Sequence, residues 1–98
     1  MAELAFLDDF RLFDGNCVRF YAHEGNRQLL CGVTAEALKQ CDSRLPHHGL
    51  IPAEAFLEAF DRLATRIHAT ARDKHARGEF EPEGDIALLV RRHDLLAR

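Results

Sequence analysis

The residues best suited to metal or thiol chemistry are three cysteines, of which Cys17 and Cys31 bracket the run CVRFYAHEGNRQLLC. His23 and Glu24 lie at the centre of this run. A structural zinc site takes cysteines in tight pairs such as C-x(2–4)-C, and the spacing here is far wider. An odd number of cysteines cannot complete a set of disulfides within one chain. We therefore expect neither a metal nor a disulfide, and we interpret Cys31 as a small buried apolar residue.

Six histidines form a second set of candidates. His47 and His48 are adjacent in an expected loop, and His93 precedes Asp94, a pairing that could form half of a general base. The sequence offers no serine or cysteine nucleophile that can be placed beside these groups. Cys41, at the expected end of a helix, should be the most reactive thiol. We predict no catalytic residue, no cofactor and no enzyme activity, and the chemical role of His47, His48, His93 and Cys41 stays open.

The bulk properties narrow the class of protein. The 98 residues suffice for a single domain, 1–98, with one core. A formal net charge of −3 argues against a protein that binds nucleic acid by neutralising phosphates. The opening run MAELAFLDDF lacks the positive start of a signal peptide, and no stretch reaches the ~18–20 apolar residues of a membrane span. We therefore expect a cytoplasmic protein without membrane association, whose thiols stay reduced.

The elements that would position these residues begin with three strands between residues 9 and 33, separated by turns at 14–16 and 23–26. The alternation in CVRFYA places Val18 and Phe20 on one face of the second strand. The turn lengths then predict pairs that share one apolar face: Phe20 with Leu29, Val18 with Cys31, Leu12 with Val18, and Phe10 with Phe20. Cys17 would lie on the opposite face from Cys31 and would be partly exposed.

Two helices and a last strand are expected next. Thr34 is a good N-cap for the run AEALKQC, and a long helix should extend from about residue 53 to 77. Its length of ~35 Å exceeds the ~20 Å of a six-residue strand, so it should overhang the sheet and leave Leu57 half-exposed. The run DIALLV predicts a final strand with Ile86 on the same face as Leu88. The fold class is therefore α+β, with an antiparallel sheet of about four strands in the order β-β-β-α-α-β and both helices packed on one face.

The order of these features resembles a known family. It is carried by V-x-F at 18–20, a second turn with Gly25, the run VTAEAL at 33–38, a long helix with Phe56 and Phe60, the pattern G-x-F-x(3)-G-x-I at 78–86, and a final Asp94-Leu95. This arrangement resembles the bacterial family of small proteins known as domain of unknown function 1488, from about Phe6 to Leu95. The resemblance implies a compact α+β fold in the bacterial cytoplasm, and it implies no activity, cofactor or catalytic residue.

Two functions from different classes follow. The leading hypothesis is a non-enzymatic domain that binds an unknown protein partner or forms a homodimer, with the half-exposed Leu57 on its interaction surface. The alternative is an accessory nucleic-acid-binding or regulatory protein that uses the basic cluster of Arg91 and Arg92, together with Arg98 and the aromatic Tyr21. These arginines could equally form a charged sheet edge that discourages pairing with another chain.

Overall fold

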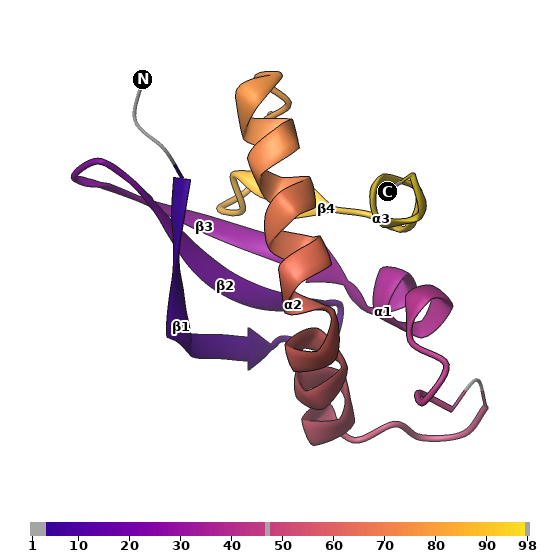
Figure 1. The fold of residues 1–98 in the computed structure, drawn as a ribbon. Helices are drawn as coiled ribbons and strands as arrows, with labels where there is room; N and C mark the ends of the chain where they lie inside the picture. The colour runs from indigo at the N-terminus through magenta and orange to yellow at the C-terminus, as the bar shows by residue number, and fades with distance from the viewer. Residues whose placement is uncertain (1–3, 47, 98) are drawn as a thin grey trace.

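The computed structural model describes residues 4–46 and 48–97. One four-stranded sheet has the order β1-β2-β3-β4, and helix α2 crosses one of its faces (Figure 1). The elements follow the chain as β1 (Leu4–Phe13), β2 (Cys17–Glu24), β3 (Arg27–Thr34), α1 (Ala35–Cys41), α2 (Ala53–Ala76), β4 (Leu88–Val90) and α3 (Arg92–Leu96). This confirms the predicted α+β class and the predicted order, to which the structure adds the short helix α3. Helices α1 and α3 lie side by side at one end of the sheet.

The hairpin of β2 and β3 has a shorter turn than the sequence suggested. Its pairs are Ala22 with Leu29, Phe20 with Cys31, and Val18 with Val33. The predicted register is therefore wrong by two residues, because the turn contains two residues, Gly25 and Asn26, in place of four. Gly25 has a φ of 59°, the left-handed value that the first position of a tight hairpin turn requires. A slip of two residues keeps every side chain on its face, so Cys17 and Cys31 lie on opposite faces as predicted.

The hairpin of β1 and β2 turns in the same way, with consequences for which side chains face outward. Gly15, with a φ of 99°, opens a second Gly-Asn turn, and Phe13 now pairs with Val18. The predicted pairing of Leu12 with Val18 is wrong by one residue, and a slip of one residue exchanges the two faces. Leu12 therefore pairs with Arg19 on the face away from the helices, where it is 51% exposed.

Further along β1 the register shifts between Phe6 and Arg11, and the strand bends sharply there (Figure 1). Within this irregular stretch Phe10 packs on Tyr21, with ring centroids 4.8 Å apart. The predicted pairing of Phe10 with Phe20 is therefore wrong as well, because Arg11 takes that position. Extra residues in one strand bend it and re-aim its side chains, which explains why both faces of β1 carry apolar residues.

Strand β4 joins the sheet beside β3 and runs parallel to it. The other two strand pairs are antiparallel, so the sheet is mostly antiparallel. The chain reaches this position after crossing the sheet as α2, and the strand is shorter than the predicted run of 85–90. Ile86 precedes the strand and does not share the face of Leu88. Its Cδ1 lies 3.2 Å from where a side chain on Gly32 would begin, on the face away from the helices. The absence of a side chain at Gly32 is what makes room for it.

The core lies between the sheet and the helices. On α2 the predicted stripe is confirmed, with Phe56, Phe60 and Ile67 buried and Leu63 partly buried against them. The ring of Phe56 stacks on Phe13 at 4.3 Å, which ties the start of α2 to β1. Within the part of the chain that is described, no helix combines the length and apolar character needed to cross a membrane.

Candidate functional site

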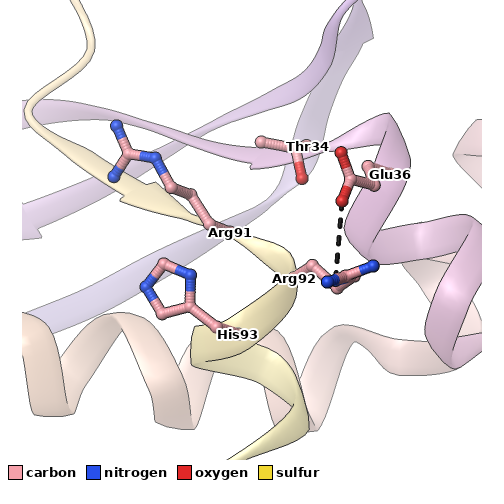
Figure 2. Close-up of a pocket in the computed structure, with 5 residues that line it drawn as sticks. All are labelled: Thr34, Glu36, Arg91, Arg92 and His93. Carbon is pink, nitrogen blue, oxygen red and sulfur yellow. Dashed lines mark ion pairs between the residues drawn. The ribbon is translucent and has the colours of Figure 1, made fainter.

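A polar hollow of about 320 Å³ lies where the end of β3, the start of α1 and the junction of β4 with α3 meet (Figure 2). Its lining residues are Thr34, Glu36, Arg91, Arg92 and His93. The structure thus brings the two predicted arginines and a predicted histidine to one place. Thr34 is the confirmed N-cap of α1, because its hydroxyl oxygen accepts the N–H of Ala37 at 3.1 Å.

Helix α3 holds three of these residues in position and is itself fixed by a buried ion pair. The Nζ of Lys74 on α2 lies 2.8 Å from a carboxylate oxygen of Asp94, with only 5% and 8% of the two side chains exposed. The same carboxylate accepts the backbone N–H of Arg91 at 2.9 Å, and Arg66 donates to the carbonyl of Leu95, which is fully buried. The Asp94-Leu95 ending therefore docks α3 onto α2.

The charge state of Asp94 follows from these contacts. Burial raises the pKa of Asp94, but the ammonium of Lys74 and the backbone N–H of Arg91 lower it by more. The pKa of this carboxyl therefore lies below its ordinary value. His93 Nε2 lies 3.3 Å from the other oxygen of Asp94, but the carboxylate is already committed to Lys74. This arrangement explains Asp94 as a structural anchor and gives no specific support to a general base at His93.

The two arginines of the hollow are held by carboxylates from other elements. Arg91 donates to both oxygens of Glu81, at 3.0 and 2.6 Å, and this contact lowers the pKa of Glu81. Arg92 makes a single, longer contact of 3.5 Å with Glu36, and both side chains are mostly exposed. Arg98 lies outside the described residues. Arg91 is therefore firmly neutralised, whereas Arg92 keeps most of its freedom.

The remaining chemical candidates do not come together. His47 lies outside the described residues and His48 is exposed. Among the residues that are described, no group of three or more potential metal ligands occurs. Cys41 is partly buried beside the end of α1. His48 and Cys41, the two of these candidates that the structure describes, therefore belong to no such group.

The other two cysteines are buried on opposite sides of the sheet. Burial raises the pKa of Cys31 to about 12, and burial followed by the nearby Asp14 carboxylate raises the pKa of Cys17. The expectation that Cys17 is partly exposed is wrong, because Ile86 and Leu89 converge on the same end of that face. Both thiols are therefore poor nucleophiles.

The second candidate region is the outer face, by which we mean the side of the sheet that carries Phe10, Leu12, Tyr21, Leu30 and Leu89. The buried residues of α1, α2 and α3 all belong to the core on the other side, so within the described chain no helix covers this one. Of the predicted interaction residues, Tyr21 lies on the outer face, while Leu57 is half-buried on α2 and packs against the core. The register error hid Phe10 and Leu12, although the repeated Gly-Asn turn could have revealed them.

A cluster of charged side chains lies on one part of the outer face. Arg19 lies 2.6 Å from Asp14 in the first turn and 2.8 Å from Asp85 in the segment before β4. Burial raises the pKa of Asp14, but Arg19 and two backbone N–H groups lower this pKa by more than burial raises it. The pKa of Asp14 therefore lies below its ordinary value. The charge in the middle of this face is therefore matched within the molecule.

Comparisons with known proteins place this fold. A family model described as a protein of unknown function, DUF1488, matches residues 4–88, which is most of the chain but stops before Asp94-Leu95. The crystal structure of a protein of unknown function from this family, from Shewanella loihica PV-4, superposes with a TM-score of 0.76 at 16% identity. The likeness covers 93% of this chain and 96% of that one. A comparison with curated proteins finds no match.

Proposed function

The chain belongs to the DUF1488 family of proteins of unknown function, and we propose that it acts as a non-enzymatic interaction domain that forms a weak homodimer through its outer face. The observation that carries this proposal is the set of apolar side chains on that face without a helix over them. Leu12 and Phe10 are 51% and 38% exposed there. Apolar groups gathered on one uncovered face are typical of a surface that meets another protein.

The charge pattern of the face supports a second copy as the partner. Arg19 is already paired with Asp14 and Asp85, so two outer faces can meet without bringing an unmatched central charge against its own image. A symmetric dimer requires this kind of self-complementary surface. A partner chosen by charge would instead need an excess of one sign in the middle of the face.

The area of the face sets the expected affinity. Four strands that lie about 4.8 Å apart, with a rise of about 3.3 Å per residue along each strand, give the outer face an area of roughly 400 Å². A standard stable interface buries about 800 Å² on each partner. We therefore expect a dissociation constant in the high micromolar to millimolar range, with dimers present only at high protein concentration.

The proposal also includes a bacterial, cytoplasmic location. It is supported by the three cysteines, all of which are free thiols, as expected in a compartment that keeps thiols reduced. The alternative of nucleic-acid binding gains no such support, because Arg91 is firmly held by Glu81 and one loosely paired arginine cannot track a polyphosphate backbone.

Sedimentation velocity across a wide range of protein concentrations tests the dimer. The variant Leu12→Lys should remain monomeric at concentrations where the natural chain associates, because it replaces an exposed apolar side chain of the outer face with an unpaired charge. Leu50→Lys is the matched control, since Leu50 is fully exposed in the loop before α2 and lies off the outer face. A natural chain that stays monomeric throughout, or equal association by the two variants, would overturn the proposal.

A further inference from the structure

We propose that the hollow between α1 and α3 binds the phosphate group of a small phosphate monoester, and that Glu36 acts as a built-in competitor for that anion. A carboxylate already occupies the position that such a ligand would take, because Glu36 Oε1 lies 3.5 Å from Arg92 Nε (Figure 2). Glu36 is 71% exposed and Arg92 is 53% exposed. An exposed ion pair with one long contact contributes little, so another anion can replace it at small cost.

The other lining groups favour an anion once Glu36 has moved aside. The lining comprises two arginines, one histidine and a single carboxylate, and Glu81 holds Arg91 from outside the hollow, so Arg92 is the lining arginine whose pairing is loose. Figure 2 shows Thr34, Glu36 and Arg92 around one space, whereas the side chains of Arg91 and His93 extend away from Arg92. His93 is largely exposed, and its Nε2 lies 3.3 Å from Asp94 Oδ1. Arg92 would therefore be the main contact to the ligand, and its guanidinium group suits a phosphate especially well.

These contacts are held in place by the docking of α3. Arg92 and His93 belong to its first turn, and the buried pair of Lys74 with Asp94 anchors that turn to α2. The backbone that carries these side chains is therefore already in place when an anion arrives, which favours binding. A depression of about 320 Å³ exceeds the size of a lone phosphate, so the organic part of a small ester also has room.

The choice of phosphate over carboxylate rests on charge. A phosphate monoester carries close to two negative charges at neutral pH, whereas Glu36 offers one. A dianion can therefore displace this side chain, while a simple carboxylate would gain nothing by the exchange. A single binding hollow also fits a small molecule better than a nucleic acid, which needs many cationic contacts along its backbone.

The test is a titration of the isotope-labelled full chain with inorganic phosphate, followed by amide chemical shifts in NMR at constant ionic strength. The amides of Glu36, Arg92 and His93 should shift along saturable curves. The variant Glu36→Gln should bind phosphate more tightly, by up to about fivefold, because the internal competitor is gone. The variant Arg92→Gln should lose at least tenfold in affinity.

The matched control is Glu54→Gln, since Glu54 occupies the first turn of α2 as Glu36 occupies the first turn of α1. It changes net charge and helix-end electrostatics equally and should leave phosphate affinity at the natural value. Equal gains in Glu36→Gln and Glu54→Gln, or shifts that never saturate, would show only a general charge effect and overturn the site. Acetate that binds as tightly as phosphate would overturn the ligand class. A single-stranded oligonucleotide that binds more tightly than phosphate would overturn the assignment to a small molecule.

Discussion

Replacing Asp94 with asparagine should destabilise the protein by about 3 kcal/mol, because the buried Lys74 ammonium loses its closest carboxylate. Breaking one partner of a buried pair typically costs about 3–5 kcal/mol. We expect the lower end, since an asparagine oxygen can still accept the backbone N–H of Arg91. The loss is a large share of the about 5–15 kcal/mol that holds a small domain together, and it corresponds to a fall in Tm on the order of 15 °C.

The assay is urea unfolding followed by far-ultraviolet circular dichroism, with the natural chain and three variants in a double-mutant cycle. Lys74→Met removes the charge, and the combination of Lys74→Met with Asp94→Asn should recover much of the stability because no buried charge remains. Asp61→Asn is the matched control. Asp61 makes two contacts with Arg11, but both side chains are substantially exposed, so its replacement should cost at most about 1 kcal/mol.

The pH dependence gives a second readout. Because contacts hold the pKa of Asp94 below its value in the unfolded chain, its contribution to stability is present above about pH 4 and is lost as the pH falls further. The stability difference between the natural chain and Asp94→Asn should therefore shrink in acid. If Asp94→Asn costs no more than Asp61→Asn at neutral pH, the account of α3 as a helix anchored by a buried pair is wrong.

Three further outcomes are expected. Gly32→Val should cost about 1–3 kcal/mol in urea unfolding, because two side chains already fill the space above this glycine; unchanged stability would show that they move aside freely. A thiol-reactive chromophore should label Cys41 quickly in the folded protein and Cys31 only in urea, so rapid labelling of Cys31 would contradict its burial. Asp42→Asn should lower the stability above about pH 4 and progressively less below that pH. Burial raises the pKa of Asp42, but Arg62 lowers this pKa by more than burial raises it. A loss of stability in urea unfolding that stays constant across that pH range would contradict this account.

The sequence predicted which residues form each strand better than it predicted how the strands meet. The alternation around Val18 and Phe20 identified the core face of β2, and that face survives the two-residue error in the turn. The predicted face of Leu12 is wrong, because the predicted turn before β2 is one residue longer than the observed turn. Turn length alone decided the difference, and local alternation carries no information about it. Spare apolar surface was expected at Leu57 because the helix is longer than the strands, whereas the register of β1 also exposes Phe10 and Leu12.

The candidate site shows the same division between local and distant information. Arg91, Arg92 and His93 are adjacent in sequence, so their proximity could be read directly. Their counter-ions could not, because Glu36 and Glu81 arrive from other segments whose placement depends on the whole fold. The role of Asp94 could not be predicted for the same reason, since its ion-pair partner Lys74 lies on α2. The sequence instead suggested a pairing of Asp94 with the adjacent His93.

The parallel pairing of β3 with β4 has a consequence for the order in which the molecule can assemble. The hairpins of β1, β2 and β3 join neighbours in the chain, whereas Cys31 meets Leu88 only after the whole of α2 has been laid across the sheet. Closing so long a loop is entropically costly, and contacts of this kind slow folding. The last strand and the helix that bears the hollow should therefore become ordered late. Pulsed hydrogen exchange during refolding would show this as protection of amides in β2 before that of amides in β4.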